Sequence, residues 1–115
     1  MVSGSQQVTP LSGPYPLLEL PFWTKSHTPG VFVLRKNGGK VERLGVSKTD
    51  VRSEIERVAQ ETGSDEFFVE YAFSEARLFF LSCVLFHAYQ LSTVQKHPEP
   101  AGTTHHCPID GCRFL

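Results

Sequence analysis

The sequence lacks an excess of charge of either sign. Eleven lysines and arginines stand against twelve aspartates and glutamates in 115 residues, which gives a formal net charge of −1. A chain that is drawn to nucleic acid by its overall charge needs a basic excess, because the affinity comes from neutralising phosphates. The composition excludes that mode of binding and leaves open only a local basic face.

Long apolar runs and cysteines are also scarce. The longest apolar run, Leu78 to Leu81, resumes at Cys83 to Phe86, and even the joined run is far shorter than a membrane span. The first residues show no charged region followed by an apolar one, so no export signal is expected. Because Cys83 lies inside the apolar run, only Cys107 and Cys112 could pair. We expect a cytoplasmic, reduced protein with no membrane partner.

The chain does contain enough apolar material for one core, since 40% of its residues are hydrophobic and nine are phenylalanine. Three parts are expected: a flexible N-terminal arm over residues 1–16, a domain over residues 17–93, and a tail over residues 94–115. The tail contains His, Cys and Pro and is expected to pack on the domain or extend it. The segment Leu17 to Trp23 is too apolar to leave in water, so we expect it to pack on the domain.

A hairpin opens the predicted fold. Gly30 to Arg35 and Lys40 to Val46 alternate as short strands do, and Asn37-Gly38-Gly39 between them accepts positive φ. Ser47 to Asp50 then offers a hydroxyl or carboxylate to cap a helix over about residues 50–61, whose apolar positions fall on one face. These positions are Val51, Ile55, Val58 and Ala59.

A third strand is predicted at Phe67 to Ala72, and a helix follows from Glu75 to about Leu91. The centre of this helix is apolar on nearly every side, which indicates burial by the sheet on one side and by something else on another. The predicted fold class is α+β, with a small three-stranded antiparallel sheet flanked by helices in the order β-β-α-β-α.

Three segments, taken in order, resemble the GIY-YIG nuclease superfamily. They are PGVFVL (residues 29–34), VERLGVSKTDVRSEI (41–55) and EYAFSEARLFFLSCVLFHAY (70–89). The segment HPEPAGTTHHCPIDGC (97–112) also resembles the tail of small bacterial members, so the likeness spans Pro21 to Cys112. The resemblance implies a GIY strand hairpinned to a YIG strand, a helix with a functional arginine, a strand, and a helix with a metal-binding glutamate.

By this resemblance, four positions lack the functional side chain. Phe32 stands at the first tyrosine, Arg43 at the second, Glu54 at the helix arginine and Ser82 at the metal-binding glutamate. Such a nuclease needs a carboxylate for a divalent cation, a tyrosine hydroxyl near the attacking water, and an arginine for the charge that builds on the phosphate. The resemblance therefore implies a degenerate member that lacks the catalytic groups.

Residues that shape the fold are retained in the same segments, among them Pro29, Gly30 and Gly45. We therefore expect a catalytically inactive GIY-YIG-like domain that acts as a binding or scaffold module for a protein or a nucleic acid. Its expected working surface is the hairpin and the 50–61 helix. If the four substituted positions mark one former active site, their side chains are expected to converge in one pocket.

The alternative is a divergent metal-dependent DNA endonuclease with a rearranged active site. A shift of the helix register puts Arg52 in the arginine role, and Tyr71, His87 and either Glu70 or Glu75 supply the other groups, with Mg²⁺ as cofactor. Two of these residues also have a structural interpretation, Tyr71 as strand packing and His87 as a packed or partly exposed helix residue.

Two groups of charged residues remain. Four basic residues gather about the hairpin, where they would contact phosphates without base specificity or protect a sheet edge from aggregation. They are Arg35, Lys36, Lys40 and Arg43. On the 50–61 helix, Glu54 and Glu61 with Arg52 and Arg57 are expected to form a solvated charged face.

The tail has the ligand inventory of a structural zinc site. Its candidate ligands are His97, His105, His106, Cys107 and Cys112. A disulfide between the two cysteines, or two free thiols, explains the same residues. Cys83 is expected to be a core residue in either case.

Overall fold

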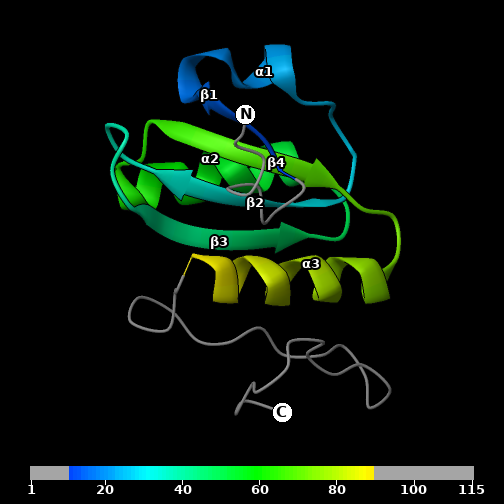
Figure 1. Ribbon diagram of the computed structural model, residues 1–115. Helices are drawn as coiled ribbons and strands as arrows, with labels where there is room; N and C mark the ends of the chain where they lie inside the picture. The colour runs from blue at the N-terminus through cyan, green and yellow to red at the C-terminus, as the bar shows by residue number, and fades with distance from the viewer. Residues whose placement is uncertain (1–10, 90–115) are drawn as a thin grey trace, which may run out of the picture.

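The computed structural model describes residues 11–89, which form a four-stranded antiparallel sheet with helices on both faces (Figure 1). The strands are β1 (Ser12–Pro16), β2 (Gly30–Arg35), β3 (Val41–Ser47) and β4 (Glu66–Tyr71), in the spatial order β1-β4-β2-β3. The helices are η2 (Leu17–Glu19, a 3-10 turn), α1 (Leu20–Trp23), α2 (Val51–Thr62) and α3 (Glu75–Ala88). The predicted α+β class is confirmed.

The sheet has four strands where the sequence predicts three. Residues 12–16, expected to belong to the flexible arm, pair with β4, with Tyr15 opposite Phe67 and Pro16 opposite Glu66. Proline has no amide hydrogen and marks loops in a sequence, but it is tolerated at a sheet edge, where one side of the strand needs no ladder bond. The Tyr15 ring also packs on the Phe67 ring, at 5.5 Å between centroids. This ring contact adds packing to the hydrogen bonds of the short strand β1.

The β2–β3 hairpin matches its prediction closely. Asn37 and Gly38 have φ angles of 53° and 70°, the left-handed conformation that this turn requires. The Asn37 N–H donates to Asp65 Oδ1 at 2.8 Å, which fastens the turn to the start of β4. A register shift after Leu34 places Arg35 opposite Val41, so β3 carries one extra residue near the turn.

Strand β2 is the centre of the sheet and is buried from Gly30 to Leu34. It pairs with β3 on one side and β4 on the other, and helices cover both of its faces. A strand covered on both faces reads as a continuous apolar run, which explains the succession of Val31, Phe32, Val33 and Leu34.

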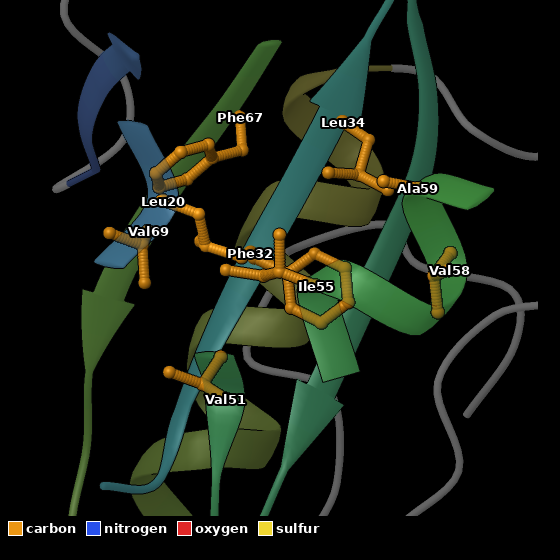
Figure 2. Packing of buried hydrophobic residues seen from close by; sticks show 9 residues of the cluster. All are labelled: Leu20, Phe32, Leu34, Val51, Ile55, Val58, Ala59, Phe67 and Val69. Carbon is orange, nitrogen blue, oxygen red and sulfur yellow. The ribbon is translucent and has the colours of Figure 1, made fainter. Parts of the chain in front are cut away.

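One face of the sheet packs against α2, and we call it the α2 side. Phe32, Leu34, Phe67 and Val69 point from the sheet into this cluster (Figure 2). Helix α2 contributes the apolar residues that its sequence predicts, and all are buried: Val51, Ile55, Val58 and Ala59. Burying one such side chain contributes about 1.5–3 kcal/mol, so this cluster is a main source of stability.

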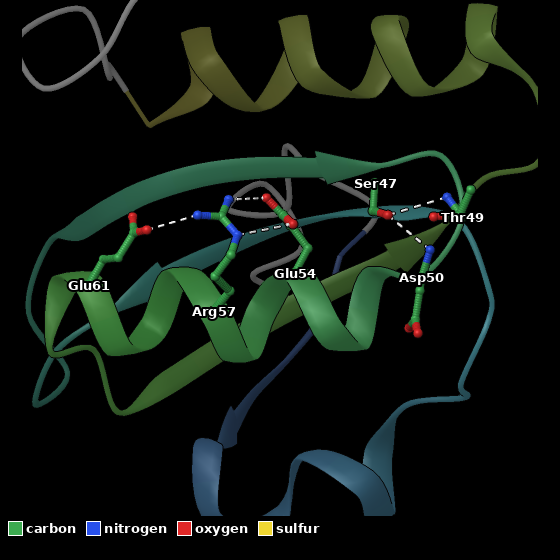
Figure 3. Close-up of polar contacts among 6 residues, drawn as sticks. All are labelled: Ser47, Thr49, Asp50, Glu54, Arg57 and Glu61. Carbon is green, nitrogen blue, oxygen red and sulfur yellow. Dashed lines mark hydrogen bonds and ion pairs between the residues drawn. The ribbon is translucent and has the colours of Figure 1, made fainter.

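The ends of α2 are fixed by local contacts. Ser53 N–H donates to the Asp50 carboxylate at the N-cap. Ser47 Oγ accepts from the backbone N–H groups of Thr49 and Asp50 (Figure 3). At the other end, Gly63 has φ of 74° and its N–H donates to Ala59 O at 2.8 Å. The predicted helix bounds are therefore right to within a residue.

The opposite face of the sheet packs against α3, and we call it the α3 side. Leu78, Leu81 and Leu85 contact Val31 and Val33 in the second buried cluster. Helix α3 begins at Glu75 as predicted, with Ser74 Oγ accepting from Arg77 N–H at 3.1 Å. Burial extends beyond the sheet-facing stripe to Phe79 and Cys83, as the nearly uniform apolar character of this helix predicts.

The segment 17–23 follows its prediction only in part. Leu20 is buried and Leu17 packs on the α2-side cluster, but Leu18 and Phe22 are 97% and 79% exposed. An apolar run of this kind predicts burial, yet two short helical turns point some of its side chains inward and the others outward. The domain predicted over residues 17–93 thus gains β1, and the 94–115 tail lies outside the described residues.

Candidate functional site

Phe32 and Gly45 face each other across the β2–β3 pair. A β-carbon on Gly45 would lie 2.1 Å from Phe32 Cζ, so the tip of the ring occupies the space over the glycine. Cζ is the atom that carries the hydroxyl in tyrosine. Since Phe32 has no hydroxyl and is fully buried, this position offers no proton to a reaction.

Arg43 and Glu54 lie on the same side of the sheet as Phe32. Arg43 is opposite Leu34 on β3 and is partly exposed. Both Glu54 oxygens contact the Arg57 guanidinium, and Arg57 Nη1 donates to Glu61 Oε2 at 2.8 Å (Figure 3). The hydrogen bond and charge of Glu54 raise the pKa of Arg57 above its usual value. Glu54 is thus paired within its own helix.

Ser82 lies on the other side of the sheet. It is buried on α3, and its hydroxyl donates to Leu78 O at 2.7 Å, a contact within the helix. Phe32 belongs to the α2-side cluster, so the sheet stands between these two side chains. The expected convergence in one pocket therefore fails at Ser82, while Phe32, Arg43 and Glu54 share the α2 side.

Arg52 and Tyr71, proposed for a rearranged site, both hold the segment that follows α1. Arg52 Nε donates to Thr24 Oγ1 at 2.9 Å, and Nη2 contacts Thr24 O and Pro21 O. The Tyr71 hydroxyl accepts from the Lys25 backbone N–H at 2.7 Å. Each contact fastens a loop to the domain. Tyr71 also packs on the α2-side cluster, as its interpretation as strand packing expects.

The remaining groups of the rearranged site are spread over the α3 side. Glu70 is opposite Val31 on the sheet face that α3 covers. Glu75 starts α3 and pairs with Lys48 at 3.2 Å, whereas His87 lies in the last turn of the same helix. Twelve residues of helix separate Glu75 from His87, which is about 18 Å along the axis. These residues and Arg52 do not form one site.

Asp50 is the described carboxylate whose ionisation the structure perturbs. The Ser53 hydroxyl donates to its Oδ2 at 2.9 Å, and this bond is the main cause that lowers the pKa of Asp50. Backbone N–H groups of Ser53 and His27 act in the same direction, while partial burial opposes them. A charged Asp50 suits a helix N-terminus, so its role is the cap of α2.

Comparison with protein-family models, with curated proteins and with solved structures gave no match to this chain. The kinship with a known family therefore rests on the sequence motifs alone.

The four basic residues of the hairpin do not share one surface. Arg35 lies on the α3 side, where Nε pairs with Glu66 Oε1 at 2.6 Å and the guanidinium stands over the Phe68 ring. Arg43 lies on the α2 side, opposite Leu34. Lys36 and Lys40 flank the turn and are exposed. The structure thus places the two arginines on opposite sides of the sheet, with the two lysines at the turn between the strands.

The proposed zinc ligands all lie outside the described residues. Within residues 11–89, no group of three or more His, Cys, Asp and Glu side chains has the placement to hold a metal ion. Cys83 is buried, as expected for a core position. Over the same range, no helix combines the length and the apolar character needed to cross a membrane.

Sequence reasoning missed an aromatic stack at the start of the domain. The Tyr15 and Trp23 rings are parallel to within 10° at 4.3 Å, and the Phe22 ring meets Trp23 edge-on at 5.1 Å. Trp23 Nε1 donates to Glu19 Oε1 at 2.8 Å. The sequence signals only the Glu19–Trp23 contact, because a spacing of four residues puts both side chains on one side of a helical turn.

Proposed function

We propose that this chain is a non-catalytic relative of the GIY-YIG nucleases that binds a partner protein through its hairpin and α2. The motif order across residues 29–89 supports the kinship. The observation that carries the loss of catalysis is the buried ring of Phe32 against Gly45, where a hydroxyl is needed and none is present.

The charges on the α2 side also support the loss of catalysis. A nuclease brings cations to the phosphate, but here Glu54 stands on the helix that the resemblance expects to supply an arginine. Glu54 is paired with Arg57, so this position supplies no cation for a phosphate and keeps the neighbouring guanidinium engaged. Arg52 cannot take over that role without leaving the carbonyl groups that it holds.

The outward face of α2 favours a protein over a nucleic acid as the partner, although the hairpin adds the cations Lys36, Lys40 and Arg43. The outward positions of α2 include Glu56 and Glu61, and Arg57 is the basic residue among them. Arg57 contacts Glu61 as well as Glu54, so the helix surface is acidic in sum. Nucleic acid binding depends on cations that neutralise phosphates, and a helix face of this sign opposes it. Protein interfaces have no such requirement.

A cleavage assay tests the proposal. The full chain is incubated with supercoiled and with single-stranded DNA in the presence of Mg²⁺ or Mn²⁺, and the expected result is no cleavage. Fluorescence anisotropy with labelled duplex DNA is expected to show nothing tighter than the non-specific range of about 10⁻⁴ to 10⁻⁶ M at physiological salt. Tighter binding would overturn the choice of a protein partner.

Three variants make the cleavage result interpretable. Arg52→Ala and His87→Ala remove groups of the rearranged site, and Arg77→Ala removes an exposed charge in the first turn of α3 as the control. Cleavage that persists in the control but disappears in Arg52→Ala or His87→Ala would refute the non-catalytic assignment and establish a divergent nuclease. Far-UV circular dichroism shows that each variant is folded.

A further inference from the structure

Two residues of α3 are buried although they point away from the sheet. Leu81 and Leu85 pack in the α3-side cluster, and Cys83 lies two residues from each of them. Two residues turn a helix by about 200°, so Cys83 points nearly opposite to both leucines. Phe79 lies four residues before Cys83 and therefore on the same side of the helix. Yet Cys83 is 0% exposed and Phe79 is 8% exposed.

The sheet does not supply this burial. Within the described part of the chain, Phe79 and Cys83 belong to neither of the two apolar clusters that pack on the sheet. The main described neighbours of α3 are β2 and β3, and no helix or strand of residues 11–89 lies beyond α3 in Figure 1. Another segment therefore covers Phe79 and Cys83, which we call the outer face of α3.

The cover extends over only part of the helix. Phe80, the residue after Phe79, is 39% exposed. Arg77 is exposed as well, and its guanidinium stands over the Phe80 ring at 5.2 Å from the centroid. A segment that enclosed the whole helix would bury both side chains. The outer face is thus a bounded docking surface, and the helix is not enclosed on all sides.

Residues 90–115 are the part of the chain best placed to cover the outer face. They follow α3 directly, because the helix ends at Ala88 with Tyr89 as its C-cap. Phe79 lies ten residues before Tyr89, which is about 15 Å along the helix axis. An extended chain spans that distance in about five residues. The segment is therefore long enough to turn back along the helix and cover Phe79.

The composition of residues 90–115 fits the same role. Five large apolar side chains are spread along this segment, whereas residues 1–10 contain only Met1, Val2 and Val8 as large apolar residues. The five are Leu91, Val94, Ile109, Phe114 and Leu115. Burying such side chains against the outer face removes apolar surface of both partners from water.

We propose that residues 90–115 dock on the outer face of α3 and complete the apolar core on that side of the helix. Phe79 and Cys83 form the docking surface, and apolar side chains of the segment cover them. The proposal does not rest on the function proposed above, because α3 and α2 lie on opposite sides of the sheet.

Nuclear Overhauser effects in the isotope-labelled full chain test the docking directly. We expect effects between the ring protons of Phe79 and methyl groups within residues 90–115. In a mixture of labelled and unlabelled chains, an isotope-filtered spectrum is expected to lack these effects. Effects from the ring only to residues 11–89, or to residues 1–10, would overturn the proposal. Effects that appear in the filtered spectrum would overturn it as well and assign the outer face to a second copy.

Two single variants test the docking surface from the side of the helix. Phe79→Ala removes a ring from that surface and is expected to shift the amide signals of residues 90–115. The matched control is Phe73→Ala, which removes a ring that is 76% exposed in the loop before α3 and is expected to leave these signals unchanged. Equal shifts in the two variants would contradict the proposal. Far-UV circular dichroism shows that each variant is folded.

A variant of the docking segment leaves residues 11–89 intact and keeps the test valid if Phe79→Ala does not fold. The readout is the initial rate at which N-ethylmaleimide alkylates Cys83, with mass spectrometry to distinguish it from the other cysteines. A covered thiol reacts only when the cover opens, so replacing three apolar residues of the segment by alanine is expected to raise this rate at least about tenfold. They are Leu91, Ile109 and Phe114.

The control for alkylation is Leu18→Ala, because Leu18 is 97% exposed on η2. Its rate for Cys83 is expected to equal that of the parent. An equal rate in the control and in the triple variant would refute the docking of residues 90–115. Protection of Cys83 that is lost on about hundredfold dilution of the parent would likewise refute it and assign the cover to a second copy.

Discussion

Replacing Gly45 by alanine tests the central contact of the hairpin. The β-carbon of alanine would stand 2.1 Å from Phe32 Cζ, 2.5 Å from Cε1 and 2.8 Å from Cε2. Real β-carbons do not approach other atoms this closely, so the ring must move. Its surroundings resist that movement, because Phe32 is fully buried beside Ile55 and Val51 (Figure 2).

The expected cost follows from the kind of strain. The φ angle of Gly45 is outside the left-handed region, so alanine fits the backbone and the cost is one of overpacking. Overpacked cores lose about 1–3 kcal/mol, and contact with three ring atoms places Gly45→Ala near 3 kcal/mol. Phe32→Leu removes the tip of the ring and by itself costs about 1–2 kcal/mol. In the double variant, the alanine methyl group enters the space that the ring has left.

The double-mutant cycle therefore has a definite expected result. Phe32→Leu with Gly45→Ala is expected to cost about as much as Phe32→Leu alone, which is a coupling of about 2–3 kcal/mol. Gly38→Ala serves as the control, because its φ of 70° costs about 1 kcal/mol and no atom lies near its β-carbon. That cost is expected to be the same with Phe32 or Leu at position 32.

Equilibrium unfolding in urea measures all of these free energies, with Trp23 fluorescence and far-UV circular dichroism required to agree. The reasoning is refuted if Gly45→Ala lies within about 0.5 kcal/mol of the parent, or if the costs of the two hairpin variants simply add. Either result would mean that the ring of Phe32 is free to move away from the glycine.

Two further predictions concern α2. Since the pKa of Asp50 is lower in the folded chain than its ordinary value, the charged form stabilises the fold above about pH 4, and this contribution is lost as the pH falls through the folded pKa. Acid titrations of unfolding are expected to show the parent losing stability relative to Asp50→Asn in that range, and parallel curves would contradict the assignment. Arg52→Ala is expected to lower the free energy of unfolding by about 1–3 kcal/mol, because the carbonyl groups of Pro21 and Thr24 lose a charged hydrogen-bond donor. It is also expected to speed hydrogen exchange in residues 17–25. Arg52→Lys is expected to recover only part, and unchanged exchange in the alanine variant would remove Arg52 from this role.

Most of the secondary structure could be predicted from the sequence, because local rules decide it. The 3.6-residue spacing of Val51, Ile55, Val58 and Ala59 identifies the buried stripe of α2, and all four are buried. Asp50 and Gly63 bound that helix because capping depends on residues next to it. Asn37 and Gly38 form the turn for the same local reason.

The candidate site could be predicted only in part. The hairpin places Phe32 against Gly45 through strand register, which sequence alternation determines. Whether Ser82 joins them depends on which face of the sheet α3 covers, and no local pattern encodes that choice. Likewise, Arg52 appeared as a candidate for phosphate because nothing in its neighbours reveals the carbonyl groups of Pro21 and Thr24.

By itself, the sequence determined the β2–β3 hairpin with its turn, α2 with its ends and buried stripe, β4 and the start of α3, because these follow from contacts within a few positions along the chain. Only the tertiary structure decided that residues 12–16 become a fourth strand and that Leu18 and Phe22 stay in water. It also decided that the sheet separates Ser82 from Phe32. Each of these outcomes depends on which segments, distant in sequence, pack against one another. The burial of a residue therefore follows from tertiary packing and not from its polarity alone.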